Sequence, residues 1–391
     1  MSYKVRLNST LEGLKPSGIR RFFDIACEMD DVISLSIGEP DFSTPWHIRE
    51  EGIKSLEKGK TWYSPNSGLM KLRECIADYT KKHKGISYDP ISEILVTVGG
   101  SEAIDLGLRA LVCPGDEVLI PEPSFVCYSP LTEMVGGIPV PIVTKAEKAF
   151  RLTPQALKAA ITHKTRLLIM PFPNNPTGAV MRREHLEEIA DIIRETGIFV
   201  LSDEIYGELT YGQQPHISFA SIEGMQERTM LISGFSKAFA MTGWRLGYAC
   251  GPKDLMKQVV KLHQYALMCA PTTAQYAAIE ALKNGDPDVE SMRAEYDVRR
   301  RYIVDRLCGM GLTCFEPEGA FYVFPSVAVT GLSSEEFSQR LLKEKSVAVV
   351  PGTAFGDSGE GFIRISYCYS LKHITEAMNR LEEFVKENRR A

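Results

Sequence analysis

The sequence predicts an α/β protein with a large domain, built on a mostly parallel β-sheet flanked by helices, and a smaller α+β domain. Three observations lead to this fold class. The chain has 391 residues, which is more than one hydrophobic core usually serves. Between residues 94 and 250, apolar strand patterns alternate with helical patterns, as they do in parallel sheets. Beyond residue 252, long helices precede short strands and two further helices, which indicates a second unit.

We expect the domain boundaries to follow this change of pattern. Residues 1–45 are predicted to form an N-terminal arm and part of the smaller domain, and residues 46–285 the large domain. Residues 286–391 are predicted to form the C-terminal small domain. A helix predicted over residues 286–310, rich in arginine, would connect the two domains.

Composition argues against several classes of function. The net charge of −5 gives no basic surface for nucleic acid, and no run approaches the ~18 apolar residues of a membrane-spanning helix. The nine cysteines form no Cys-x-x-Cys pair, and the first sixteen residues lack the apolar core of a signal peptide. We therefore expect reduced thiols and a cytoplasmic protein. The seven histidines are widely spaced, so no metal site is predicted.

The first elements of the chain carry two candidate site residues. We predict a strand over residues 32–37 and helices over residues 19–29, 45–57 and 69–82. Gly38 follows the strand in a tight corner, where a glycine would let a ligand approach the backbone closely. Tyr63 stands at the crest of the loop before the last of these helices. Each could also be an ordinary turn residue.

A predicted phosphate cradle begins at the next strand. Residues 94–98 form an apolar strand that runs through Gly99 and Gly100 directly into a helix beginning with Ser101 and Glu102. Such a junction places several free N–H groups and the positive end of the helix dipole at one point. The residues match neither the dinucleotide pattern nor the P-loop pattern, so we expect a small phosphorylated ligand held at one end. An ordinary tight turn is the alternative.

Two further strands are predicted to end in candidate site residues. The strand over residues 117–121 leads to Phe125 and Tyr128, which are one helical turn apart and could face one site, although such pairs more often belong to a core. The strand over residues 166–170 ends in a loop dense in prolines and amides that contains Asn175. Polar loops at strand ends are where α/β folds place their sites.

Asp203 closes an apolar strand predicted from residue 198. A carboxylate in that position needs a cation, a hydrogen-bond donor or a raised pKa. Tyr206 follows three residues later and is expected to lie beside it.

Lys237 follows another apolar strand, over residues 229–232, and has small or apolar neighbours. These surroundings lower the pKa of a lysine and favour nucleophilic attack on a carbonyl, as in Schiff-base formation. Ser236 precedes Lys237, and Arg245 follows it by eight residues. A solvated surface lysine is the alternative for a lysine taken alone.

The candidate residues at successive strand ends are expected to meet. Parallel strands bring their carboxyl ends to one edge of a sheet, and this edge would then carry Ser101, Phe125, Asn175, Asp203 and Lys237. Their convergence weighs more than any single motif.

In the smaller domain, strands are predicted near residues 319–324, 347–350 and 361–366, with helices over residues 334–345 and 371–388. Arg364 alternates with Ile363 and Ile365, so it points to the opposite face of its strand. A structural ion pair is the common role of such an arginine.

Together these motifs resemble the class I and II aminotransferases of the pyridoxal-phosphate fold-type I group, nearest to prokaryotic aspartate and aromatic aminotransferases. The similarity extends over nearly the whole chain and includes residues 38–42, 174–178, 202–206, 236–237 and 362–364. It implies a seven-stranded sheet in the large domain. It also implies the transfer of an amino group between an L-amino acid and a 2-oxo acid.

The resemblance implies roles for the candidate residues toward pyridoxal 5'-phosphate. Lys237 would form the internal aldimine and carry the proton, Asp203 would pair with the pyridinium nitrogen, and Asn175 and Tyr206 would bind the phenolic oxygen. Phe125 would lie over the ring. The residues implied to hold the phosphate are Gly100, Ser101, Glu102, Ser236 and Arg245, with Ser233 as an alternative to Ser236.

The remaining roles concern the substrate and the subunit arrangement. Arg364, with the Gly38 backbone and Asn175, would bind the substrate α-carboxylate. Tyr63 would reach the phosphate of the neighbouring subunit, which implies a homodimer with shared active sites. Some relatives carry Trp at the position of Phe125, His at that of Tyr128 and Ser at that of Gly234.

Other activities and the substrate remain open at this stage. A β-C-S lyase would use the same cofactor and fold, and a non-catalytic pyridoxal-phosphate-binding regulator would carry an added DNA-binding domain. We expect glutamate and 2-oxoglutarate as one substrate pair and a larger amino acid as the other partner, because Phe22, Phe23 and Tyr63 would suit a large side chain. A second cation for a dicarboxylate could not be placed, since Arg20, Arg21 and Arg109 lie in no motif.

Overall fold

The computed structural model describes residues 7–14, 16, 18, 31–212 and 214–389. The helix expected over residues 19–29 lies outside these ranges. Within them, no helix combines the length and the apolar character needed to cross a bilayer.

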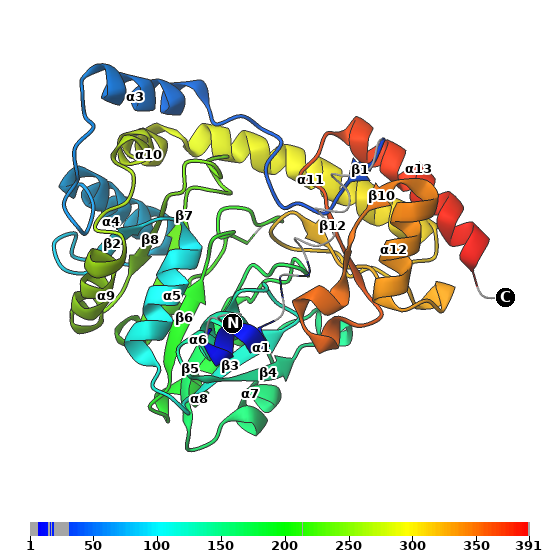
Figure 1. The fold of residues 1–391 in the computed structure, drawn as a ribbon, viewed down its shortest axis with the longest axis horizontal. Coiled ribbons are helices and arrows are strands. Elements are labelled where there is room, and N and C mark those ends of the chain that lie inside the picture. The colour runs from blue at the N-terminus through cyan, green and yellow to red at the C-terminus, as the bar shows by residue number, and fades with distance from the viewer. Residues whose placement is uncertain (1–6, 15, 17, 19–30, 213, 390–391) are drawn as a thin grey trace, which may run out of the picture.

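A seven-stranded sheet forms the centre of the large domain (Figure 1). Its order is β2-β8-β7-β6-β5-β3-β4, and β8 is the strand that runs antiparallel to its neighbours. The strands are β2 (Ile94–Thr97), β3 (Glu117–Glu122), β4 (Ile138–Val143), β5 (Thr165–Met170), β6 (Phe199–Asp203), β7 (Thr229–Gly234) and β8 (Gly247–Cys250). The expected mostly parallel sheet of seven strands is confirmed.

Helices cover both faces of this sheet. They are α3 (Trp46–Glu57), α4 (Met70–Lys84), α5 (Gly100–Leu111), α6 (Tyr128–Met134), α7 (Pro154–Ala160), α8 (Arg183–Arg194), α9 (Lys253–Ala266) and α10 (Thr272–Asn284). In β5, Leu167 and Ile169 belong to the core cluster that includes α5 and α9, whereas Leu168 and Met170 belong to the cluster that includes α7 and α8. Successive side chains of a strand point to opposite faces, so a strand buried on both faces is apolar throughout.

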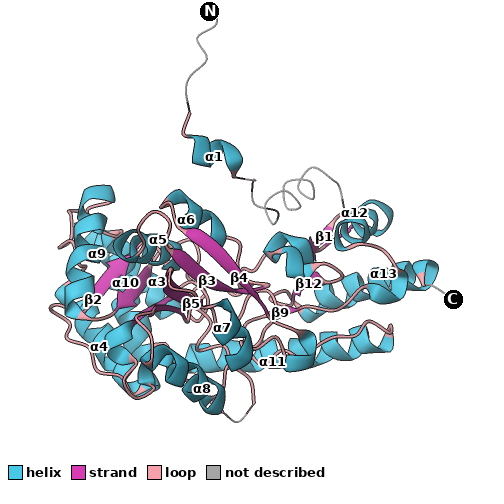
Figure 2. Cartoon of the chain, turned by 90° about the horizontal axis from the view of Figure 1, so that it is seen from below, coloured by secondary structure: helices cyan, strands magenta, loops and turns pink. Residues whose placement is uncertain are grey.

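The C-terminal strands, together with β1 near the N-terminus, form two smaller sheets. One pairs β1 (Ile33–Ser34) in parallel with β10 (Val347–Ala348), and the other is antiparallel, with β12 (Ile363–Ser366) between β11 (Val350–Pro351) and β9 (Tyr322–Val323). The remaining helices are α1 (Ser9–Gly13), α11 (Asp286–Gly309), α12 (Ser334–Lys345) and α13 (Leu371–Asn388). In Figure 2, α12 and α13 lie beside β12 at one end of the molecule, and α11 extends toward them. The helices expected over residues 334–345 and 371–388 are confirmed, as are strands near residues 319–324 and 361–366. The single strand expected over residues 347–350 is divided between β10 and β11, which belong to different sheets.

Candidate active site

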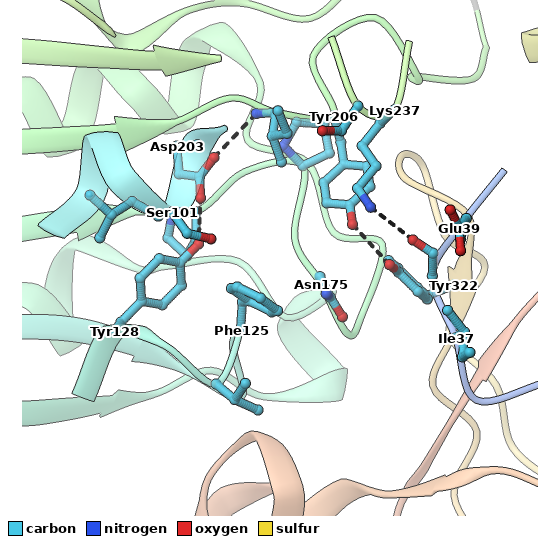
Figure 3. Close-up of a pocket in the computed structure, with 18 of the residues that line it drawn as sticks. Ile37, Glu39, Ser101, Phe125, Tyr128, Asn175, Asp203, Tyr206, Lys237 and Tyr322 are labelled. Atoms are coloured by element: carbon cyan, nitrogen blue, oxygen red, sulfur yellow. Dashed lines mark hydrogen bonds between the residues drawn. The ribbon is translucent and has the colours of Figure 1, made fainter. Parts of the chain in front are cut away.

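A cavity of about 560 Å³ lies where the parallel strands of the large sheet end, facing the segments that carry β9 and β12 (Figure 3). Strand-end residues from β3, β5, β6 and β7 all reach it, so the predicted convergence is confirmed. The predicted site residues that line it are Gly38, Gly100, Ser101, Phe125, Asn175, Asp203, Tyr206, Ser236, Lys237, Arg245 and Arg364.

Lys237 lies three residues beyond the end of β7. Its Nζ donates a hydrogen bond of 2.8 Å to the carbonyl of Gly38, and the rings of Tyr206 and Phe321 lie about 6 Å from it. Burial lowers the pKa of Lys237 to about 8. The amine is therefore partly neutral near physiological pH, as a nucleophile requires. The alternative of a solvated surface lysine is wrong.

Asp203 ends β6 and presents its carboxylate to the same cavity. The carboxylate accepts hydrogen bonds from the Tyr128 hydroxyl at 2.8 Å and from the Ile205 N–H at 3.2 Å. Burial nevertheless raises the pKa of Asp203 to about 6. Among the described residues no cation pairs with it, so a ligand with a protonated nitrogen would supply the missing charge.

Arg364 is only 2% exposed, yet within the described chain no carboxylate pairs with it. Its Nη1 donates to the Asn175 side chain at 3.0 Å, its Nη2 donates to the Ser36 carbonyl, and its Nε has no partner there. The alternative of a structural ion pair is therefore wrong. A buried guanidinium that faces a cavity without a counter-charge favours an anionic ligand.

A second anion-binding position lies at the N-terminus of α5. Gly100 and Ser101 line the cavity there, and Ser236 and Arg245 line it too. Gly99 has a φ of +81°, and a Cβ on it would lie 2.9 Å from Nη2 of Arg245, so only glycine lets the arginine approach the turn. Ser233 is 1% exposed and does not line the cavity, which favours Ser236 as the serine that contacts a ligand.

Two predicted residues lie elsewhere. The carboxylate of Glu102 accepts from the Val98 N–H and binds Nδ1 of His263 at 2.6 Å, so only its backbone remains for an anion at the helix start. Tyr63 does not line the cavity and is 77% exposed.

Tyr322 lines the cavity and was not identified from the sequence. Its hydroxyl lies 2.8 Å from that of Tyr206, and a Cβ on Gly38 would lie 1.7 Å from the Tyr322 hydroxyl. Gly38 therefore makes room for a tyrosine of this chain, whereas the sequence led us to expect a ligand in that space. Phe321 and Tyr322 are both buried. The available signal was the single hydroxyl-bearing side chain within the apolar run Ala320-Phe321-Tyr322-Val323-Phe324.

Comparisons with known proteins agree with this geometry. A family model described as aminotransferase class I and II matches residues 30–381. An aspartate aminotransferase of Pyrococcus abyssi is 48% identical and an aromatic-amino-acid aminotransferase 2 of Thermococcus litoralis is 47% identical, each over 98% of this chain and 99% of the relative. The crystal structure of an aromatic aminotransferase from Pyrococcus horikoshii superposes with a TM-score of 0.90 at 48% identity, over 94% of this chain and 99% of that one.

Proposed function

This chain belongs to the class I and II aminotransferases and is an aminotransferase, and from that premise we propose that its cavity binds pyridoxal 5'-phosphate through Lys237. The observation that carries the proposal is that one cavity is lined by Lys237, whose pKa is lowered, and by Asp203, whose pKa is raised and which has no cation beside it among the described residues. Neither the family match nor the relatives favour the lyase that the sequence left open.

The residues fit this cofactor at each of its polar groups. Asp203 offers a buried anion without a cation to the ring nitrogen, and the start of α5 with Ser236 and Arg245 offers donors to the phosphate. Asn175 and Tyr206 line the same cavity and offer donors to the phenolic oxygen, and Phe125 offers a ring face. When bound, the cofactor supplies an aldehyde that accepts the amino group and a ring that withdraws electrons from the substrate carbon.

The chain's own residues then account for binding and proton transfer. Arg364 and Asn175 would hold the substrate α-carboxylate, which fixes the position of the Cα hydrogen. The free amine of Lys237 would accept the proton from the substrate Cα and would later donate a proton at a second carbon to complete the amino-group transfer. Its lowered pKa suits a group that must both accept and release a proton near neutral pH.

Capture of pyridoxal phosphate by the apoenzyme should follow the pKa of Lys237. Only the neutral amine attacks an aldehyde, so the rate should rise about fivefold from pH 7 to pH 8 and level off above about pH 9. Stopped-flow absorbance would measure this rate, with Nα-acetyl-lysine as the reference amine. A rate that keeps rising tenfold per pH unit to pH 10, as an ordinary lysine requires, would contradict the assignment.

We propose glutamate and 2-oxoglutarate as one substrate pair and a larger, apolar amino acid as the other partner. In the described chain the cations that line the cavity are Lys237, Arg245 and Arg364, each with a proposed role. Arg109, considered as a second cation for a dicarboxylate, pairs with Asp105 at 2.7 Å outside the cavity. Apolar wall residues support a large side chain: Ile37, Ile104, Phe125, Val126 and Ile205.

A half-reaction screen tests both the activity and the substrate proposal. The loaded enzyme, without any oxo acid, should lose the absorbance of the bound aldehyde form with glutamate and with aromatic or long aliphatic amino acids. Each reactive amino acid should yield its 2-oxo acid in a 1:1 ratio to the amine form of the cofactor. If aspartate alone reacts at an appreciable rate, the large-side-chain proposal is wrong.

A homodimer with shared active sites accounts for the exposed aromatic residues. Trp62 and Tyr63 are exposed neighbours, and Tyr265 near the end of α9 is exposed too. The Thr272 hydroxyl donates to the Trp62 carbonyl at 2.8 Å, which joins the loop of Trp62 and Tyr63 to the start of α10. Exposed aromatic side chains of this size are typical of an interface. We propose that a second copy covers them and that Tyr63 enters the partner's site. The free thiols of the described cysteines support a cytoplasmic location.

A further inference from the structure

We propose that Tyr322 is a positioning residue for both halves of the reaction, orienting the Tyr206 hydroxyl toward the cofactor and the Arg364 guanidinium toward the substrate. The inference rests on the proposed function, because it concerns how the cavity holds pyridoxal phosphate and an amino acid. Tyr322 is 1% exposed, belongs to β9 and contacts both residues on which it acts. Figure 3 shows its hydroxyl beside that of Tyr206.

The hydroxyl of Tyr322 decides where the Tyr206 hydrogen points. The two hydroxyls are 2.8 Å apart, and among the described residues neither forms another hydrogen bond. Each hydroxyl carries one hydrogen, so one of them donates and the hydrogen of the other remains free. If Tyr322 donates, the Tyr206 hydrogen is left for an acceptor in the cavity.

Arg364 makes Tyr322 the better donor of the two. Burial raises the pKa of Tyr322 to about 12, with the nearby Arg364 charge opposing that rise. Burial also raises the pKa of Tyr206, and the Arg364 charge opposes that rise as well. The Arg364 guanidinium carbon lies 4.6 Å from the centre of the Tyr322 ring, and among the described residues no such contact joins it to the Tyr206 ring. A cation in contact with a phenol ring makes that phenol the stronger donor, so Tyr322 donates to Tyr206 and Tyr206 can donate to the phenolic oxygen of the cofactor.

The ring of Tyr322 holds Arg364 in place. The guanidinium carbon lies 4.6 Å from the centre of the Tyr322 ring and 4.9 Å from that of Phe355. A cation between two aromatic faces in a buried site is attracted to both. Since no carboxylate of the described chain fixes this arginine, its direction is determined by the two rings, Asn175 and the Ser36 carbonyl.

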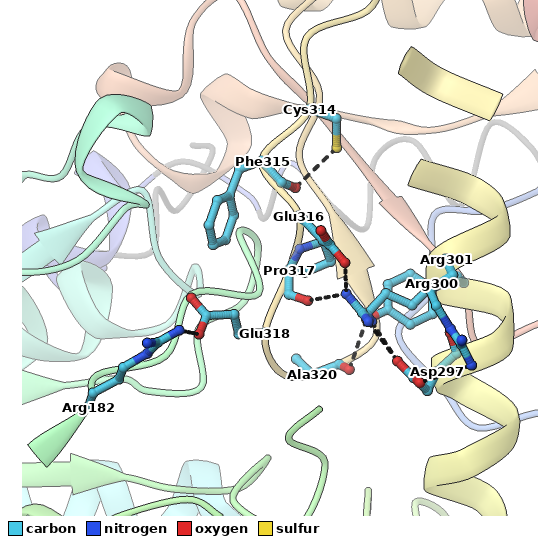
Figure 4. Close-up of polar contacts among 11 residues, drawn as sticks. Arg182, Asp297, Arg300, Arg301, Cys314, Phe315, Glu316, Pro317, Glu318 and Ala320 are labelled. Atoms are coloured by element: carbon cyan, nitrogen blue, oxygen red, sulfur yellow. Dashed lines mark hydrogen bonds and ion pairs between the residues drawn. The ribbon is translucent and has the colours of Figure 1, made fainter. Parts of the chain in front are cut away.

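The segment before β9 is itself held from two sides (Figure 4). Glu318 pairs with Arg182 at 2.7 Å, and Glu316 pairs with Arg300 of α11 at 2.6 Å. The N–H groups of Glu318 and Gly319 both donate to the carbonyl of Gly178, at the end of the loop that carries Asn175. Tyr322 therefore has a defined position relative to both Asn175 and Arg364.

Two substitutions separate the roles of hydroxyl and ring. Tyr322→Phe removes the hydroxyl and keeps the ring, so the pH midpoint of the bound cofactor's absorbance change should rise by about 0.5–1 unit. The same variant should keep the KM for glutamate within about twofold of the original protein. Tyr322→Leu removes the ring as well, and the KM should rise about 5- to 30-fold.

Tyr367→Phe is the matched control. Tyr367 is also fully buried, and its hydroxyl donates to the Ala320 carbonyl, two residues from Tyr322, but it does not line the cavity. The Tyr367→Phe variant should change neither the pH midpoint of the absorbance change nor the KM for glutamate. Cofactor stoichiometry near one per chain shows that each variant is folded.

The inference is overturned if Tyr322→Phe shifts the midpoint no more than Tyr367→Phe does, or if Tyr322→Leu leaves the KM at the Tyr322→Phe value. Failure of the proposed function itself would be recognised from the unsubstituted protein. If the unsubstituted protein loaded with pyridoxal phosphate shows no pH-dependent absorbance change, the cofactor proposal falls, and the inference falls with it.

Discussion

Replacing Lys237 with alanine should lower kcat by at least about 10³-fold, because the substitution removes both the covalent attachment and the group that moves the proton. The phosphate-binding residues are untouched, so the variant should still bind pyridoxal phosphate, as dialysis or fluorescence would show. Lys237→Arg should be equally inactive, because its guanidinium stays protonated and forms no such linkage.

The matched control for Lys237 is Lys158→Ala, which replaces an exposed lysine on α7 and should leave kcat unchanged. Addition of ethylamine to Lys237→Ala should restore part of the activity, since a free amine can replace the missing base in the cavity. Turnover of Lys237→Ala within tenfold of the original would contradict the role assigned to this lysine.

Asp203→Ala should raise the activation free energy by roughly 3–5 kcal/mol and so lower kcat roughly 10²- to 10⁴-fold, because the charged ring nitrogen would lose its buried partner. Steady-state kinetics at saturating pyridoxal phosphate would measure the loss. The hydroxyl of Tyr128 would also lose its acceptor, so thermal unfolding should be recorded for each variant.

Asp203→Asn separates charge from shape. Asparagine keeps a hydrogen-bond acceptor for Tyr128 but carries no charge, so it should be about as inactive as alanine while retaining the stability of the apoprotein. Asp203→Glu should recover part of the activity. A near-native kcat for Asp203→Asn would show that another group holds the ring nitrogen.

The parallel strands and their ends could be predicted because each strand is buried on both faces and reads as a short apolar run. β4 could not, since it lies at the sheet edge, is partly exposed and contains Pro139 and Pro141. β8 also lacked a signal, because it is only four residues long and owes its place to pairing with β2 and β7.

In the site, residues that follow parallel strands were predictable, and residues placed by packing between distant segments were not. Lys237 and Asp203 belong to the first kind. Tyr322 belongs to the second, since its contacts with Gly38, Tyr206 and Arg364 join four separate parts of the chain. The sequence also could not show that the Glu102 side chain turns away to His263, 161 residues later.

The cofactor is proposed to attach to Lys237, and Lys84, a second buried lysine, provides an internal comparison. Burial acts to lower the pKa of Lys84, but the carboxylates of Glu204 and Glu208 outweigh it and raise that pKa, so the amine stays charged. Lys84 should therefore not react with an aldehyde, although it too is enclosed.

The most direct test is reduction of the loaded protein with borohydride, followed by peptide mapping by mass spectrometry. One phosphopyridoxyl group per chain should be found on the peptide that contains Lys237, and none on the peptide that contains Lys84. A label on Lys84 or any other lysine, with Lys237 unmodified, would contradict the account.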